Sequence, residues 1–282
     1  GADLIANNII PSQTGIVQFK GNGANLSTNG IVVMLNSNNL DGKIKWNTSL
    51  LYNFNRDKVT SYDVKQSSNL QTILNNVQNP LVGYPYYAVF SFPSAGLDDT
   101  GNPRGYLNSE VSKDYAKITT VFDSEQIKFH GSGSPKHFGS IINTLNYSGF
   151  ELTFNIVYKF DYYFRREMVF SGGNYGVASA LEFGLGDYEK RWQKPGDETT
   201  TKTPSLIYPN SAARTNFFQY SEDLVEKGDH IRLQDARLSY NLIKDKKKMA
   251  MLKGLNIFLY ARNLGIIGTH NQLNIDPDSR TT

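Results

Sequence analysis

Apolar and polar residues alternate along one stretch of this chain for sixteen residues. From Phe150 to Arg165 every even position is apolar, and six of the eight odd positions are polar or charged. A period of two predicts a β-strand, because successive side chains of a strand point to opposite faces of the sheet. The apolar positions are Phe150, Leu152, Phe154, Ile156, Tyr158, Phe160, Tyr162 and Phe164.

The length of this run favours a strand that crosses a membrane. Sixteen residues at roughly 3.3 Å each span about 50 Å. Strands of soluble proteins usually stop at roughly 3–10 residues, and a bilayer crossing needs roughly 9–11. Charged side chains on the other face suit a water-filled lumen better than a dry core. We therefore predict an all-β fold, an antiparallel transmembrane β-barrel segment, with Glu151, Asn155, Lys159 and Asp161 facing the lumen.

The same alternation, less regular, predicts further strands. Residues 31–36 and 45–54 form one expected pair, joined by a hairpin turn at Asp41-Gly42. Residues 138–147 form a strand that turns at Ser148-Gly149 into the long strand. A later pair is expected at residues 230–242 and 255–263. Weaker strands are expected near residues 15–20, 58–64, 86–92 and 116–129, for roughly ten strands in all.

The connections between these strands are unequal in length. Some have two to four residues, whereas the connection from Ser171 to Lys227 is long. Short turns on one side and long loops on the other are typical of an outer-membrane barrel, with the turns periplasmic and the loops extracellular. The sequence shows no internal repeat of fixed period.

Composition supports this class and excludes others. The 282 residues contain 17 Tyr and 16 Phe but only two Trp, and 24 Gly; aromatic residues suit the interface girdles of a barrel. No run of 18 apolar residues predicts a membrane helix, and no export leader is present at Gly1. The chain has no cysteine, which excludes disulfides. The net charge of +3 and the absence of a basic face argue against nucleic-acid binding, and we interpret the lysines at 244 and 246–248 as a solvated turn.

Motifs for enzyme or metal chemistry are lacking. The four histidines, His130, His137, His230 and His270, do not have metal-ligand spacing, and there is no G-x-S-x-G or phosphate-binding loop. Asp98 to Asn102 resembles part of a calcium loop, but its glycine comes too early, so we interpret it as a tight turn. We predict no catalytic residues, no metal site and no cofactor.

Two aromatic segments are candidates for ligand contact. Aromatic rings stack on sugars and grip peptides while their polar groups remain available. The alternative for both segments is a girdle of the barrel or packing within loops. The candidate residues are Tyr84, Tyr86 and Tyr87 in the first segment, and Tyr188, Trp192 and Tyr208 in the second.

Several segments, in order, resemble the SusC/RagA family of TonB-dependent outer-membrane transporters of Bacteroidetes. The resemblance covers most of the chain and is specific because the segments occur in the family's order. The similar segments are Tyr86-Tyr87-Ala88-Val89-Phe90, Ala95-Gly96-Leu97-Asp98, Phe138-Gly139-Ser140-Ile141-Ile142-Asn143-Thr144, Gly149-Phe150-Glu151-Leu152, Tyr162-Tyr163-Phe164-Arg165-Arg166, Arg191-Trp192-Gln193-Lys194-Pro195-Gly196-Asp197-Glu198, Gly228-Asp229-His230-Ile231-Arg232-Leu233 and Tyr260-Ala261-Arg262-Asn263-Leu264.

The resemblance implies a 22-stranded barrel with a plug, in the bacterial outer membrane, that imports oligosaccharides or peptides. It also implies two protein partners, a SusD-like surface lipoprotein and TonB. By this resemblance, residues 1–282 match the C-terminal part of the barrel only; the plug, the TonB box and the last strand have no counterpart in them. Because an open sheet edge cannot lie in lipid, we expect further barrel strands to pair at both ends. A surface-exposed β-rich glycan-binding or adhesin module without transport is the alternative function.

Overall fold

The computed structural model describes residues 2–8, 19–62, 70–74, 80–120, 126–166, 186–209, 211–242, 255–271, 273 and 275–279. The chain divides into two compact units. We call one the sheet unit, which comprises Asn29–Arg56, Ser134–Tyr162 and Lys227–Thr282. We call the other the loop unit, which comprises Gly1–Thr28, Asp57–Gly133 and Tyr163–Glu226.

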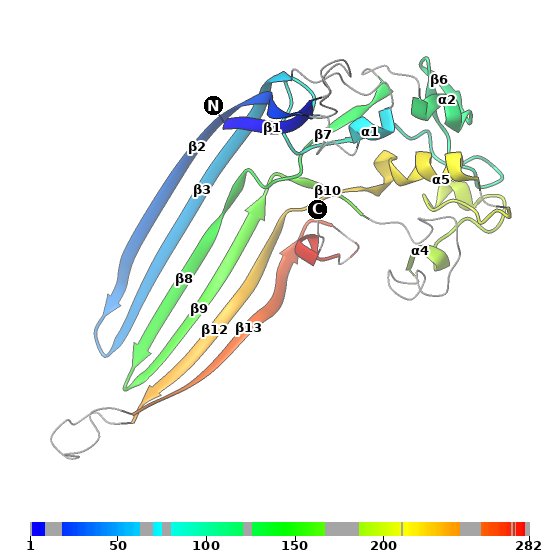
Figure 1. The fold of residues 1–282 in the computed structure, drawn as a ribbon. Coiled ribbons are helices and arrows are strands. Elements are labelled where there is room, and N and C mark those ends of the chain that lie inside the picture. Colours follow the sequence, from blue (N-terminus) through cyan, green and yellow to red (C-terminus); the bar gives the residue numbers. More distant parts are fainter. Residues whose placement is uncertain are drawn as a thin grey trace. The chain divides into compact units, whose positions relative to one another are not determined.

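The principal element is a seven-stranded sheet with the order β1-β2-β3-β8-β9-β12-β13. Its long strands lie side by side in this order (Figure 1). Each neighbouring pair whose register is known is antiparallel. The strands are β1 (Ala2–Asn8), β2 (Phe19–Asp41), β3 (Ile44–Tyr62), β8 (His137–Tyr147), β9 (Phe150–Phe160), β12 (His230–Asn241) and β13 (Asn256–Thr269).

Shorter elements lie in the two long connections, β3 to β8 and β9 to β12. Their strands pair in three two-stranded sheets, β4-β7, β5-β6 and β10-β11. These strands are β4 (Ala88–Ser91), β5 (Gly105–Leu107), β6 (Glu110–Ser112), β7 (Lys128–Ser132), β10 (Tyr163–Arg165) and β11 (Val225–Lys227). The helical segments of the described residues are α1 (Leu70–Leu74), α2 (Tyr115–Thr120), α4 (Gly186–Glu189), η3 (Asp197–Thr199), α5 (Ala212–Gln219), η4 (Glu222–Leu224) and η5 (Pro277–Ser279). Within the described residues, no helix is long and apolar enough to cross a membrane.

The strands expected from strong alternation are confirmed. The runs at 31–36, 45–54 and 138–147 lie in β2, β3 and β8. Those at 230–242 and 255–263 correspond to β12 and β13, and β13 extends six residues beyond the expected end. The all-β antiparallel fold predicted from the sequence is therefore the fold of the molecule.

The turn between β8 and β9 shows how the local sequence sets a hairpin. Ser148 and Gly149 have φ of 48° and 94°, so both positions are left-handed, as a two-residue hairpin requires. Glycine tolerates this conformation and serine adopts it at a modest cost. The result is a full ladder from Tyr147–Phe150 to His137–Phe160.

Two predictions of strand extent were wrong. The strand expected from Phe150 to Arg165 ends at Phe160, because Asp161 adopts a φ of 58° and the chain bends before β10. The strand expected at residues 116–129 is replaced at its start by α2, where the Asp114 side chain accepts a hydrogen bond from the Lys117 N–H and thus caps the helix. Of the described residues of that range, 116–120 and 126–129, only 128–129 are extended, in β7.

Some expected features lie outside the described residues. These are positions 15–18 and 63–64 of two weaker strands, positions 171–185 and 210 of the long connection, the lysines at 244 and 246–248, and Gly254. The described parts of those two strands, residues 19–20 and 58–62, belong to β2 and β3 and do not form separate strands. The strand expected at 86–92 is the shorter β4, at Ala88–Ser91.

The loop unit has a hydrophobic core of its own. Phe217 of α5 is fully buried and its ring lies 5.8 Å from that of Phe92 and 5.5 Å from that of Tyr115. Since Phe92 and Tyr115 precede β8 and Phe217 follows β9, two separate connections share one core. Its buried members are Leu70, Ile73, Leu74, Leu81, Ala88, Phe90, Phe92, Ile118, Ile127 and Phe217.

Candidate functional site

One face of the sheet unit is apolar across five adjacent strands. Residues directly opposite each other in an antiparallel pair point to the same face, so the register shows which side chains share a face. The ladders place Leu50 opposite Ile141, Ile141 opposite Ile156, and Leu238 opposite both Leu152 and Leu259. The pattern seen within β9 in the sequence is thus continued in its neighbours.

This apolar face carries aromatic side chains in two belts. Near the short turns lie Trp46, Tyr147, Phe150 and Tyr240, and the rings of Phe150 and Tyr240 are 4.4 Å apart. Near the other end of the strands lie Tyr52, Phe54, His137, Tyr158 and Phe160. Phe150 and Tyr158 are eight residues apart on β9, which corresponds to about 26 Å along the strand. Two aromatic belts that flank an apolar band roughly 25 Å tall are typical of outer-membrane barrels.

Polar groups on the apolar face are hydrogen-bonded to each other. The side-chain oxygen of Asn143 accepts from Trp46 Nε1 at 2.9 Å and from Thr48 Oγ1 at 2.7 Å. The Thr48 hydroxyl in turn accepts from Asn39 Nδ2 at 2.6 Å. Polar groups in lipid must be satisfied within the protein, and this cluster meets that need.

The opposite face of the sheet unit is mainly polar and charged. Glu151, Asn155 and Lys159 of β9 lie on it, opposite Ser239, Asp235 and His230 of β12. Asn155 Nδ2 donates to Asp235 Oδ2 at 3.2 Å. Three of the four residues expected to face a lumen therefore share one face with polar neighbours.

Asp161, the fourth, lies in the bend after β9 and not on the strand. Its carboxylate pairs with Lys136 Nζ at 2.8 Å, and its backbone N–H donates to Asp229 at 2.7 Å. The alternation did not reveal this change because Asp161 and Tyr162 continue the polar-apolar order of the sequence.

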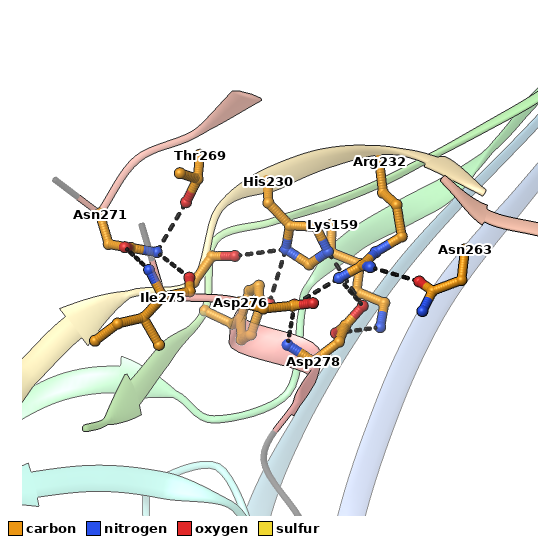
Figure 2. Close-up of polar contacts among 11 residues, drawn as sticks. Lys159, His230, Arg232, Asn263, Thr269, Asn271, Ile275, Asp276 and Asp278 are labelled. Carbon is orange, nitrogen blue, oxygen red and sulfur yellow. Dashed lines mark hydrogen bonds and ion pairs between the residues drawn. The ribbon is translucent and has the colours of Figure 1, made fainter. Parts of the chain in front are cut away.

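Five ionisable side chains meet on the polar face in a charged cluster, which consists of Lys159, His230, Arg232, Asp276 and Asp278 (Figure 2). Lys159 Nζ donates to Asp278 Oδ1 at 2.7 Å, and His230 Nε2 lies 3.2 Å from Asp278 Oδ2. Arg232 donates through Nη2 to Asp276 at 2.5 Å. The hydrogen bond with His230, and after it that with Lys159, holds the pKa of the Asp278 carboxyl well below its usual range.

The ring of His230 is fully enclosed. Its Nδ1 lies 2.8 Å from the carbonyl oxygen of Gly228 and 3.0 Å from the Tyr162 hydroxyl, and its Nε2 faces the Asp278 carboxylate. The carbonyl and the carboxylate only accept hydrogen bonds, whereas the hydroxyl can donate or accept. The cluster thus contains three basic side chains and two carboxylates.

The two aspartates belong to a short acidic turn, residues 275–279, that Asn271 fixes. The Asn271 side chain donates to Thr269 Oγ1 at 2.8 Å and to the Ile275 carbonyl at 2.9 Å, and it accepts from the Ile275 N–H at 3.0 Å. The Asp278 N–H donates to Asp276 Oδ1 at 2.9 Å. Sequence reasoning missed this cluster; the only signal was that His230 and Arg232, two positions apart, share a face.

The aromatic candidates lie in the loop unit and have different surroundings. Tyr84 lies edge-on to Phe90 and Phe129, with ring centroids 5.0 and 4.9 Å apart, and Tyr86 lies edge-on to Tyr87 at 4.8 Å. Tyr84 and Tyr87 keep part of their rings exposed.

The second aromatic group is divided between packing and exposure. Tyr208 is 94% exposed and Tyr188 is 41% exposed. Trp192 instead packs its ring against Gly101 and donates from Nε1 to Glu198 at 2.9 Å. The structure therefore gives Trp192 a packing contact, while Tyr188 and Tyr208 present surface.

The Asp98 to Asn102 segment is a tight turn, as interpreted from the sequence. Asp98 accepts from the N–H groups of Thr100 and Asn102 at 3.0 and 2.7 Å and from Lys113 Nζ at 2.7 Å. Burial would raise the pKa of Asp98, but these donors outweigh it and hold the pKa well below its usual range. Within the described residues, no group of three or more His, Asp or Glu could hold a metal ion.

Comparison with known proteins agrees with this geometry. No family model matches the chain. The TonB-dependent receptor P26 of Formosa agariphila is 24% identical over 288 residues, which cover 93% of this chain and 27% of the receptor.

Solved structures of RagAB share the fold. The RagAB peptide transporter aligns over 99% of this chain with a TM-score of 0.70 and 17% identity, and the closed-closed state of the RagAB peptide importer aligns over 95% with 0.65 and 18%. The chain covers 29% of each matched RagAB chain, so it spans less than a third of the relatives' length. The chain thus resembles SusC/RagA-type TonB-dependent receptors in sequence and shares the fold of their β-barrel, which confirms the resemblance drawn from its motifs.

Proposed function

We propose that this chain is part of an outer-membrane active importer that takes up oligosaccharides or peptides. Residues 1–282 would form part of a TonB-dependent receptor barrel, energised by TonB and working with a SusD-like surface lipoprotein. The relatives support this: one is a TonB-dependent receptor and another is a peptide transporter.

The observation that carries the proposal is the two-faced sheet. Five strands in register place an apolar face with two aromatic belts on one side and a charged face on the other. A soluble sheet would bury its apolar face against a second layer. A barrel wall exposes that face to lipid and keeps the charged face toward a watery lumen.

The edges of the sheet support a proposal about the rest of the barrel. In the described sheet, β1 ends the order on one side and β13 on the other. Unpaired edge groups are not tolerated in lipid. We therefore propose that further barrel strands, in the same protein or another chain, pair with both edges.

The residues of this chain would line the path and make no covalent change in the cargo. Glu151, Asn155 and Lys159 would form part of the lumen wall, and Asp161 would lie at its mouth. Tyr84, Tyr86, Tyr87, Tyr188 and Tyr208 would offer contacts to cargo in the loop unit.

Heat modifiability and uptake test this function. The full-length protein should fractionate with the outer membrane and migrate faster on SDS gels when unheated. A strain that lacks it should lose uptake of a labelled oligosaccharide or peptide, and loss of TonB should have the same effect. A full-length protein that is soluble without detergent would refute the proposal.

A surface-exposed glycan-binding or adhesin module remains the second candidate, because Tyr84, Tyr87, Tyr188 and Tyr208 are exposed. Both candidates predict that cells without TonB still bind glycan. Only the importer predicts that glycan accumulates inside cells with TonB and that this accumulation stops without it.

A further inference from the structure

The charged cluster on the polar face of the sheet has the composition of an occupied anion site. His230 of β12 lies directly opposite Lys159 of β9, and Arg232 follows on the same face. Their donors converge on the carboxylates of Asp276 and Asp278 at 2.5 to 3.7 Å. The side chains of His230 and Arg232 are 0% and 8% exposed, so rigid strands hold them in place.

Two polar atoms next to the cluster have no partner among the described residues. They are Arg232 Nε, a donor, and Asn155 Oδ1, an acceptor, and both are closed to solvent. Arg232 pairs with Val157 across the ladder, two residues from Asn155, so both atoms belong to the same part of the face. Leaving a buried polar atom unpaired is unfavourable, and such atoms mark a place where a ligand or water completes the network.

We propose that Lys159, His230, Arg232 and Asn155 form a subsite for a carboxylate group of the transported cargo, which the acidic turn at residues 275–279 occupies as an internal stand-in. The proposal rests on the proposed function, because the cargo must pass along this face. When the turn lifts, a carboxylate of the cargo takes the positions of the Asp278 and Asp276 oxygens, and Arg232 Nε becomes available to it.

The donor set selects the chemistry of the ligand. The cations Lys159 and Arg232 suit a carboxylate, the His230 ring adds a third nitrogen, and the arginine fork adds bidentate geometry. Asn155 Oδ1 accepts, so it fits an N–H or O–H next to the carboxylate. A peptide C-terminus has such an N–H and a uronic acid has such an O–H; both sources share the chemistry.

The turn is built to be displaced. Its two aspartates keep 37% and 33% of their side chains exposed, and the Asn271 side chain holds its first residue, Ile275, through two hydrogen bonds. A tethered carboxylate competes with free cargo, and the apparent affinity falls by the fraction of molecules in which the turn is open.

Equilibrium binding to the purified full-length receptor tests this. The probes are a hexapeptide with a free C-terminal carboxylate, the same peptide as its amide, tri-galacturonic acid, and its methyl ester. The Asp276→Asn/Asp278→Asn variant should bind at least one acid probe about tenfold more tightly than the wild type, as expected if the turn is closed ten times as often as it is open. The amide and the ester should show no gain.

Further variants separate the subsite from a loss of structure. Arg232→Gln in the double-variant background should remove the gain, whereas Lys45→Gln, on the same face near the short turns, should leave it. Asn271→Ala keeps all five ionisable side chains and should give a smaller gain, about threefold, for the same probe. Unheated gel mobility confirms that each variant is folded.

The outcomes decide both the site and its ligand. A gain for the peptide acid alone identifies a peptide C-terminus, and a gain for tri-galacturonic acid alone identifies a uronate. Equal gains for acid and neutral probes, or no gain in either the double variant or Asn271→Ala, would overturn the subsite. Loss of cellular uptake is measured separately, so a receptor that binds acids but does not import them would refute transport and leave the subsite standing.

Discussion

The two units of this chain differ in the side chains that dominate their buried positions. In the loop unit the buried cluster is apolar and contains Phe90, Phe92 and Phe217. In the sheet unit most described residues that are buried are polar, namely Asn143, His230, Arg232, Ser239 and Asn271, while leucines and isoleucines on its strands are exposed. The loop unit has an apolar interior, as a domain surrounded by water does. The sheet unit has an apolar outer face, as a barrel sheet between lipid and water does. One chain therefore combines a unit with an apolar core and a unit whose apolar side chains lie on its surface.

The largest expected effect concerns the core of the loop unit. Phe217→Ala removes a fully buried ring between Phe92 and Tyr115, and should cost about 3–5 kcal/mol of local stability. Hydrogen exchange should show faster opening of residues 88–120 and 211–226, with the strands of the sheet unit unchanged. Equal loss of protection in β8 and β9 would show that the two units do not respond separately.

A charged substitution should destabilise the protein much more on the apolar face of β9 than on its polar face. Phe154→Arg places a cation midway between the aromatic belts and should cost about 2–4 kcal/mol in a lipid bilayer. Thr153→Arg, one residue away on the polar face, should cost much less. Urea unfolding in liposomes measures both variants, and similar costs would contradict the assignment of lipid and lumen faces.

Substitution of Gly139 in β8 should test how closely this strand packs against its neighbours. A Cβ at Gly139 would lie 1.9 Å from the Leu51 carbonyl oxygen and 2.7 Å from the Tyr158 hydroxyl, whereas one at Gly268 meets nothing within 4 Å. Gly139→Ala should therefore cost about 1–3 kcal/mol. Gly268→Ala serves as the control and should leave the midpoint of unfolding nearly unchanged.

The smallest expected effect is a dependence on pH confined to the loop unit. Burial, with a contribution from Lys128, lowers the pKa of His130 from 6.5 to about 4, and its Nε2 lies 2.7 Å from Ser91 Oγ. The unfolded chain then binds more protons than the folded one between these values, so stability present above pH 6.5 is lost as pH falls toward 4. His130→Gln should flatten this part of the melting profile, and an unchanged slope would exclude His130 as its source.

The sequence predicted the sheet unit better than the loop unit for a physical reason. A strand between lipid and water has one solvent per face, so its alternation survives in the sequence, as in Phe150 to Phe160. The helix α2 formed where a strand was expected because Ile118 packs into a core supplied by a distant segment. The partners of Lys159 come from a turn 119 residues away, and no local pattern reports such a contact.

The shared core of the loop unit has a consequence for exchange of parts between related proteins. Arg214 of one connection reaches the other connection, where it donates to Asn102 at 2.9 Å and to the Gly101 carbonyl at 3.0 Å. A graft that transfers only residues 63–136, or only 163–229, would separate these donors from their acceptors and Phe217 from its pocket. In natural or engineered recombination, the two connections should therefore be exchanged together. Surface properties that depend on either connection would then change with both.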